Sequence, residues 1–141
     1  MSLGMEGVSN METIMVCVTK QKTCQRLIDY GKGLMKSADD SIHIIHVANT
    51  DYNFLGDTEE HRALEYLYEK AREAGAELTV LKSDDVVGTL GQLVEQNDIT
   101  KVVVGAANEI DVASGFIYRL RLRLAGKADL VVVPIDSEEK N

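Results

Sequence analysis

Five short apolar runs recur along the chain, and each is rich in β-branched residues. They occupy residues 13–18, 42–47, 78–81, 101–105 and 130–134. Polar residues, glycine or proline bound these runs, which is typical of strands buried on both faces of a sheet. The last run ends at Pro134, the only proline of the chain. The pattern therefore predicts five strands, the fourth of which stops at Gly105.

The segments between these runs repeat their apolar residues every three or four positions, which predicts amphipathic helices. After the first run the stripe comprises Leu27, Ile28, Gly31, Leu34 and Met35; after the second it comprises Ala63, Leu64, Leu67, Ala71 and Ala74. Thr23 and Thr58 are suitable starts for these two helices, and Gly75 is a suitable end for the second. A third helix is expected to begin at Ser83 or Asp84.

The segment between the fourth and fifth runs contains two patterns that predict different structures. Arginine and leucine alternate over residues 119–124, and this period of two is typical of a strand. The apolar positions 116, 117, 120 and 124 also share one helical face, and Gly126 provides a stop. We predict a helix, because two parallel strands need a crossover between them.

Strands that alternate with helices predict an α/β fold. We expect an open five-stranded parallel sheet in the order 3-2-1-4-5, with helices on both faces. Ligands of such sheets bind outside the carboxyl ends of the strands, where the strand order reverses. That position lies between strands one and four, so the implicated loops begin after Val18 and at Gly105.

Length and charge limit the classes of function. A chain of 141 residues is enough for one self-sufficient domain, which we place at residues 12–136. Residues 1–11 are expected to be a flexible tail, partly left by cloning, and residues 137–141 a disordered one. The net charge of −8 argues against binding to nucleic acid. Neither a signal peptide nor an apolar run of membrane-spanning length is present, so we expect a cytoplasmic location.

Several residues suggest chemistry but are better explained as structure. Cys17 and Cys24 are spaced for neither a redox motif nor a zinc site. His43 and His46 lie three apart on a strand, so they point to opposite faces and cannot share a metal. No nucleophile has a plausible base, so we expect no catalysis beyond weak ATP hydrolysis.

Charged groups leave further alternatives open. Asp84 and Asp85 are expected to cap a helix, although they lie at the carboxyl edge, where a magnesium-phosphate role is the alternative. Asp39 and Asp40 are expected to form a solvated turn at the opposite edge. Four cations lie within nine residues: Arg119, Arg121, Arg123 and Lys127. We interpret them as a solvated helix face, with attraction of an anion or an acidic partner as the alternative.

These features resemble the universal stress protein family over residues 13–135. The resemblance rests on the first strand, on residues 45–47, on the segment Ala74-Gly75-Ala76-Glu77-Leu78 and on residues 101–105. Within the family, the chain looks most like the stress-protein domain of KdpD-type potassium-sensor kinases, whose first strand also ends without an acid. The resemblance implies an adenine-nucleotide alpha hydrolase-like fold.

Members of this family that bind ATP carry a G-x2-G-x9-G-[ST] motif after strand four. Gly105 matches its first position, but Asn108 replaces the second glycine. Gly115 matches the third glycine only if about three residues are missing, and Phe116 then replaces the hydroxyl residue. Thr19 stands where ATP-binding members usually have an acid. With these departures, the resemblance implies a nucleotide site formed by Thr19, Val47, Gly105, Asn108, Gly115 and Phe116.

The fifth strand is expected to be a sheet edge, which favours pairing with a second copy. The family resemblance implies the same homodimer, through Leu130, Val131, Val132 and Val133. We expect a dimeric regulatory domain that senses ATP or another adenine nucleotide with magnesium. The alternative is a protein-interaction module in stress or potassium signalling that binds no nucleotide. A weak hydrolase, with Asp84 or Asp85 holding the metal, is a third hypothesis.

Overall fold

The computed structural model describes residues 11–18, 24–48, 58–106 and 115–134. The strands are β1 (Thr13–Cys17), β2 (Ser41–Ala48), β3 (Glu77–Lys82), β4 (Lys101–Ala106) and β5 (Asp129–Pro134). The helices are α2 (Cys24–Gly33), α3 (Thr58–Glu73), α4 (Val86–Asn97) and α6 (Phe116–Leu124). The strands form one sheet in the order β3-β2-β1-β4-β5, and all four pairings are parallel. The predicted fold class and strand order are confirmed.

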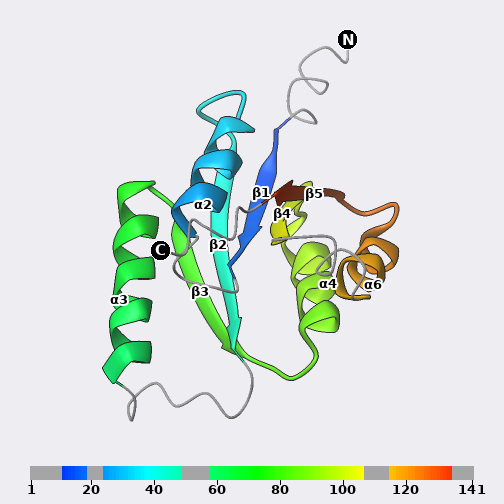
Figure 1. Ribbon diagram of the computed structural model, residues 1–141. Coiled ribbons are helices and arrows are strands. Elements are labelled where there is room, and N and C mark those ends of the chain that lie inside the picture. Colours follow the sequence, from blue (N-terminus) through cyan, green and yellow to red (C-terminus); the bar gives the residue numbers. More distant parts are fainter. Residues whose placement is uncertain (1–10, 19–23, 49–57, 107–114, 135–141) are drawn as a thin grey trace.

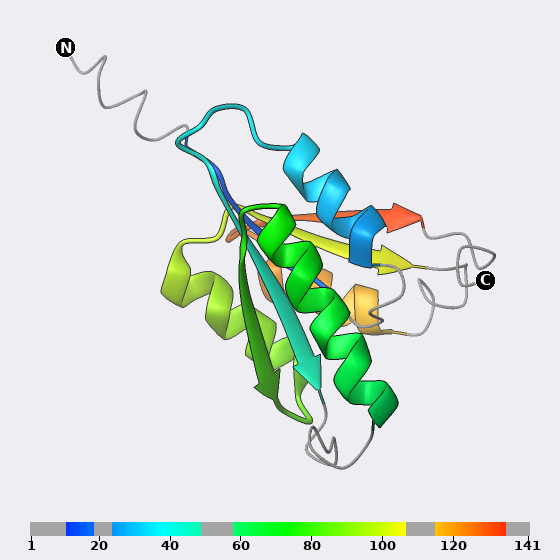
Figure 2. The same ribbon diagram turned by 90° about the vertical axis from the view of Figure 1, so that its left-hand side faces the viewer.

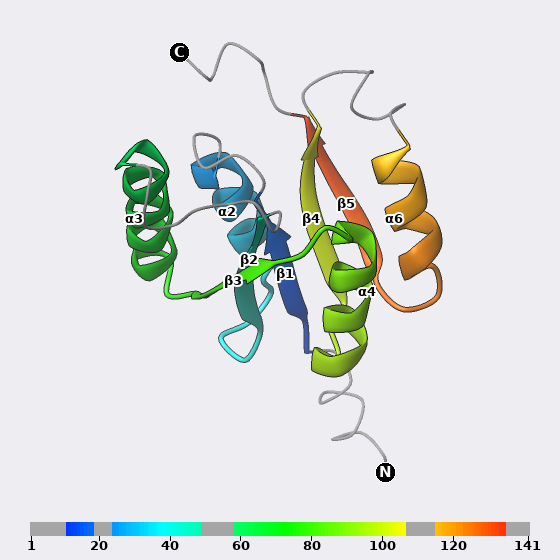
Figure 3. The same cartoon turned by 90° about the horizontal axis from the view of Figure 1, so that it is seen from below.

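The helices cover both faces of the sheet, as Figures 1 and 3 show. α2 and α3 lie on one face, and α4 and α6 lie on the other. No helix in the described part of the chain is long and apolar enough to cross a membrane. The predicted tails, 1–11 and 137–141, lie outside the described residues apart from Met11, as does Thr23, the expected cap of α2.

Two element boundaries differ from the sequence prediction. β4 does not stop at Gly105, because β5 continues to pair with it: Gly105 faces Val133 and Ala106 faces Pro134. α4 begins later than expected, because Asp85 is its N-cap, and the Asp85 carboxylate accepts a hydrogen bond of 3.0 Å from the N–H of Gly88. A cap at this position satisfies a donor that the helix itself cannot.

The arginine and leucine alternation of residues 119–124 forms a helix, as predicted. Ile117, Leu120 and Leu124 are buried on the inner side of α6, whereas Arg119 and Arg121 are exposed. The alternating pattern matters less than these three residues, because burying each of them against the sheet and α4 contributes about 1.5–3 kcal/mol.

Alternate residues of β1, β2, β4 and β5 belong to two separate cores. The α2/α3 core contains Ile14 and Val16 of β1, and the α4/α6 core contains Met15 and Cys17 of the same strand. This division follows from the period of two along a strand. A strand with both faces covered needs apolar residues at every position, which is why β1 reads as one continuous apolar run.

α2 approaches the sheet unusually closely at Gly31. A Cβ atom at this position would lie 2.6 Å from Cγ2 of Val16 and 3.2 Å from Cδ1 of Ile42. Val16 belongs to a central strand and cannot move freely in a close-packed core. Gly31 is therefore required by the packing of α2, although the sequence pattern assigned it only to an apolar stripe.

We predict that Gly31→Ala lowers the free energy of unfolding by about 1–3 kcal/mol, because the added methyl overpacks the core. Gly33→Ala is the matched control, since a Cβ added there would meet no atom within 4 Å. That control should be neutral or stabilising by about 0.5–1 kcal/mol, because alanine is the better helix former. Urea denaturation measures both, and equal effects of the two substitutions would contradict this account of α2.

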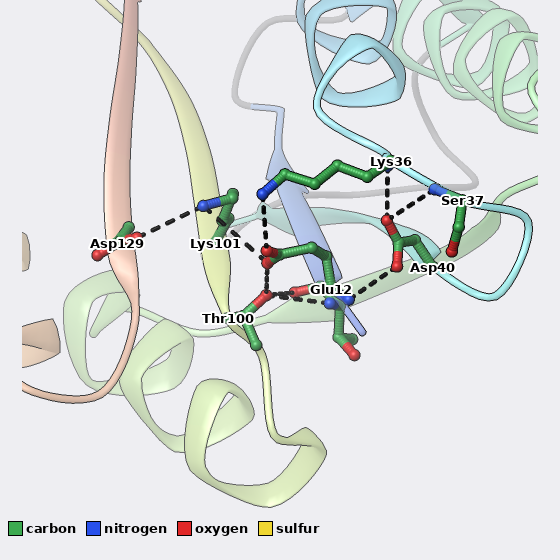
Figure 4. A network of polar contacts seen from close by, with 8 residues as sticks. Glu12, Lys36, Ser37, Asp40, Thr100, Lys101 and Asp129 are labelled. Atoms are coloured by element: carbon green, nitrogen blue, oxygen red, sulfur yellow. Dashed lines mark hydrogen bonds and ion pairs between the residues drawn. The ribbon is translucent and has the colours of Figure 1, made fainter. Parts of the chain in front are cut away.

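A polar network ties the amino ends of the strands together (Figure 4). Asp40 is 6% exposed, and its carboxylate accepts hydrogen bonds from the N–H groups of Glu12, Lys36 and Ser37 at 2.9, 2.6 and 3.3 Å. These bonds, that of Glu12 first, hold the pKa of Asp40 below its usual value. Asp40 does lie at the amino edge, but the prediction that it belongs to a solvated turn is wrong, because its carboxylate is enclosed by backbone donors.

Thr100 extends this network to the other half of the sheet. Its hydroxyl accepts a hydrogen bond of 3.0 Å from the N–H of Thr13 and donates one of 2.6 Å to the Glu12 carboxylate. Lys101 lies 4.0 Å from the same carboxylate and 3.5 Å from that of Asp129. The amino ends of β1, β2, β4 and β5 are thus fixed by side chains as well as by the ladder.

We predict that Asp40→Asn lowers the melting temperature by several degrees at pH 7, because an amide cannot accept hydrogen bonds at both of its terminal atoms. Asp39→Asn, in the same turn but exposed, is the matched control and should change little. A lowered folded-state pKa stabilises the fold above the ordinary value of 3.8, and the gain is lost as pH falls through that lower pKa. The difference between the parent and Asp40→Asn should therefore shrink in acid, and a constant difference would contradict the assignment.

Candidate functional site

The carboxyl ends of the strands meet at one edge of the sheet. Figure 2 shows the arrowheads of β2 to β5 spread into a fan along this edge by the twist of the sheet. The strand order reverses between β1 and β4, so the chain leaves these two neighbouring strands toward opposite faces. Such a reversal opens a crevice at the strand ends, which is where ligands of open α/β sheets bind.

α6 begins near this edge without a side-chain cap. Its N-cap residue, Gly115, has a left-handed backbone with φ of 99°, and it makes no capping side-chain hydrogen bond. The Gly115 carbonyl starts the helix by accepting a bond of 2.8 Å from the N–H of Arg119. Because glycine offers no oxygen to the first N–H groups of the helix, another acceptor can fill that role. An anion suits the position, because the helix dipole is positive there.

Two of the predicted site residues pack against the same core. Val47 of β2 and Phe116 of α6 are both half-buried, and both pack against the α4/α6 core. The Phe116 side chain therefore contributes packing where the family motif would place a hydroxyl. Apolar side chains such as these suit contact with the face of a base better than contact with a phosphate.

The structure places four of the six predicted site residues at or beside the carboxyl edge. Val47 and Gly105 lie near the ends of β2 and β4, and Gly115 and Phe116 begin α6. Thr19 and Asn108 lie outside the described residues. Gly105 pairs with Val133 of β5, so it lies within the sheet.

His46 is a residue whose role the sequence did not indicate. It is 3% exposed, and its Nδ1 lies 2.8 Å from the carbonyl oxygen of Val18, at the end of β1. His43 behaves differently: its side chain is 33% exposed and lies 3.5 Å from Glu77. The prediction of two structural histidines on opposite faces fits both contacts. The sequence feature that could have indicated the role of His46 was the position of its polar ring in an otherwise apolar strand.

The turn before α4 uses its polar groups internally. The Asp85 carboxylate caps the helix, and the Thr89 hydroxyl lies 2.8 Å from both the Ser83 hydroxyl and the Asp85 carbonyl. The capping role predicted for this aspartate is confirmed. Within the described residues, no group of three or more His, Cys, Asp or Glu side chains is arranged to hold a metal ion.

Two of the four clustered cations are engaged between α4 and α6. The Glu95 carboxylate binds Lys127 and also Arg123, whose Nη1 lies 2.9 Å away. These hydrogen bonds, that of Lys127 first, lower the pKa of Glu95 to about 2. Interpreting all four as a solvated face is therefore wrong for Arg123, which is half-buried, whereas Lys127 is exposed although it is paired. It holds for the exposed Arg119 and Arg121.

The two thiols are unsuited to chemistry. Cys17 and Cys24 are both buried, and burial raises the pKa of Cys17 to about 12 and that of Cys24 to about 11. A buried thiol that keeps its proton is a poor nucleophile and a poor metal ligand. Both cysteines serve as small apolar residues of the two cores.

No protein-family model and no curated protein matches the sequence, but solved structures match its fold. A universal stress protein in complex with cAMP is 16% identical, with a TM-score of 0.61 over 86% of this chain and 95% of its own. A universal stress protein from Archaeoglobus fulgidus in complex with dAMP is 14% identical, with a TM-score of 0.51 over 89% and 98%.

The same fold also occurs in a different chemical setting. The U34-tRNA thiolase of Methanococcus maripaludis, which holds a [4Fe-4S] cluster, is 12% identical, with a TM-score of 0.57 over 93% of this chain and 54% of its own. At such identities the likeness establishes the fold alone. What this chain binds must be argued from its own residues.

Proposed function

We propose that this chain is a universal-stress-protein-like regulatory domain that binds an adenine nucleotide at the carboxyl edge of its sheet. The observation that carries the proposal is the start of α6 at Gly115, an N-cap residue without a capping side chain, beside the edge where the strand order reverses. Two proteins with this fold are complexes with adenine nucleotides, cAMP and dAMP, which supports the choice of ligand class.

In this proposal the phosphates lie between the end of β4 and the start of α6. Backbone N–H groups that follow Gly105 and Gly115 donate to them, and Thr19 and Asn108, which lie outside the described residues, complete the proposed site. The base lies against Val47 and Phe116, which are half-buried at the same edge. Magnesium enters with the phosphates of ATP, as its bound counterion.

Backbone donors are central to this proposal, because the side chains depart from the family motif. Asn108 adds a side chain where a glycine would let phosphate approach, and Phe116 lacks the hydroxyl donor. Main-chain N–H groups at a helix start are present whatever side chain the residue carries. We therefore expect the site to recognise the adenine base and the first phosphate of the nucleotide more strongly than the remaining phosphates of a triphosphate.

We predict that Gly115→Ala lowers the affinity for ATP with magnesium by about tenfold, because a Cβ at φ of 99° strains the helix start and displaces its donors. Gly126→Ala is the matched control: its φ is 78°, it lies at the opposite end of α6, and an added Cβ would have open space around it. Isothermal titration compares the two variants. If both bound ATP as tightly as the parent, the placement of the phosphates would be wrong.

The second part of the proposal is a homodimer formed through β5. In the described sheet β5 pairs only with β4, so its outer edge is unpaired. Leu130, Val131 and Val132 are half-buried and alternate between the two cores. An apolar edge strand is a template for pairing with a second copy.

We predict that Val132→Lys converts a dimer into a monomer, because a lysine on an edge strand opposes edge-to-edge pairing. Thr79→Lys, on the exposed part of the opposite edge strand β3, is the matched control and should leave the dimer intact. Sedimentation equilibrium distinguishes the 15.5 kDa monomer from a particle of twice that mass. A monomeric parent protein would contradict this part of the proposal.

A protein-interaction module is the second candidate, and the outer face of α6 favours it. Tyr118 and Leu122 are 62% and 59% exposed and lie four residues apart, so they share one face of the helix. The exposed Arg119 and Arg121 flank them. An exposed apolar pair rimmed by charge is typical of a protein contact. A protein that binds no nucleotide, yet loses a partner when Tyr118 is changed, would favour this function.

A further inference from the structure

We infer that His46 is the positioning residue of the nucleotide site, because its ring fixes the point at which the chain leaves β1. This inference rests on the proposed function above. Val18 is the last described residue before Thr19, one of the proposed site residues. Its carbonyl accepts a hydrogen bond from Nδ1 of His46 at 2.8 Å.

The bond occurs where the backbone ladder ends. The register of β1 and β2 stops at Cys17, opposite Ile45, and the Val18 N–H still donates to the Ile45 carbonyl at 2.9 Å. If the parallel ladder continued, the N–H of Val47 in β2 would donate a hydrogen bond to the Val18 carbonyl. The imidazole of His46 supplies a donor in its place. β1 can therefore end at Val18 without leaving the buried Val18 carbonyl unpaired.

Burial makes this contact costly to replace. Val18 is 1% exposed and His46 is 3% exposed, so water has little access to either group. A buried carbonyl without a donor costs about 1–3 kcal/mol. An imidazole inside an apolar strand is also unfavourable unless it is hydrogen-bonded. The pair therefore holds the end of β1, at Val18, against β2.

The chemistry also defines which ring atom acts. A carbonyl oxygen only accepts, so Nδ1 must carry the hydrogen. The amide nitrogen of asparagine stands the same number of bonds from Cβ as Nδ1, whereas that of glutamine stands one bond further, as Nε2 does. Asparagine can therefore replace the donor in place, and glutamine cannot.

The other side of β2 is fixed as well. The Ser83 N–H donates to the Ala48 carbonyl at 2.8 Å, which ties the end of β2 to the turn after β3. Val47, the expected contact of the base, lies between Ala48 and His46 in β2. Hydrogen bonds therefore hold the residues on both sides of Val47, His46 to the end of β1 and Ala48 to the turn after β3.

The test compares His46→Gln with His46→Asn in the full chain. We expect His46→Gln to lower the affinity for ATP with magnesium by about tenfold, and His46→Asn, which keeps the donor of Nδ1 but loses the rest of the ring, to lower it less. Amide hydrogen exchange should accelerate at Val18 in His46→Gln while Val16 stays protected. Thr100→Val, which breaks the amino-edge network, is the control for general destabilisation and should leave affinity unchanged.

Three results would overturn the inference. They are parent-like affinity and exchange in His46→Gln, equal losses in both His46 variants, or an equal loss of affinity in Thr100→Val. Failure of the proposed function gives a different pattern. In that case the parent itself binds no adenine nucleotide, and faster exchange at Val18 in His46→Gln would still identify His46 as the residue that fixes the end of β1.

Discussion

Because every strand of the sheet is parallel, all amino ends lie at one edge and all carboxyl ends at the other. The two edges are built differently. At the amino edge, Asp40 and Thr100 join chain segments far apart in the sequence through short hydrogen bonds. At the carboxyl edge the described ends are held by the His46 side chain, by the turn of Ser83, Asp85 and Thr89, and by backbone bonds.

Most of the fold could be predicted because its signals are local. Continuous apolar runs identified the strands, and Gly75 and Gly126, both with positive φ, marked helix ends. The segment around Leu120 was harder, since its alternation fits a strand, and only the need for a crossover decided it. The extension of β4 to Ala106 could not be read from the sequence, because it depends on pairing with β5.

The errors and omissions share a physical cause. Asp40 looked like a solvated turn residue, and Arg123 like a solvated cation, because a sequence does not reveal which distant groups enclose a side chain. The Asp40 carboxylate accepts a hydrogen bond from the N–H of Glu12, and Arg123 of α6 donates one to Glu95 of α4. For the same reason, His46 was predicted to be structural, but its hydrogen-bond partner, the Val18 carbonyl, could not be identified. The candidate site was predicted through its glycines, and two of its six members, Thr19 and Asn108, lie outside the described residues.

The central claim is that main-chain donors at the carboxyl edge bind an adenine nucleotide. The most direct measurement is a titration of the isotope-labelled protein with ATP and magnesium, followed by amide resonances in NMR spectra. The account predicts saturable shifts at Gly105, Gly115 and Phe116, with little change at Thr100 and other amides of the amino edge. An absence of shifts at the carboxyl edge, or shifts confined to the amino edge, would contradict it.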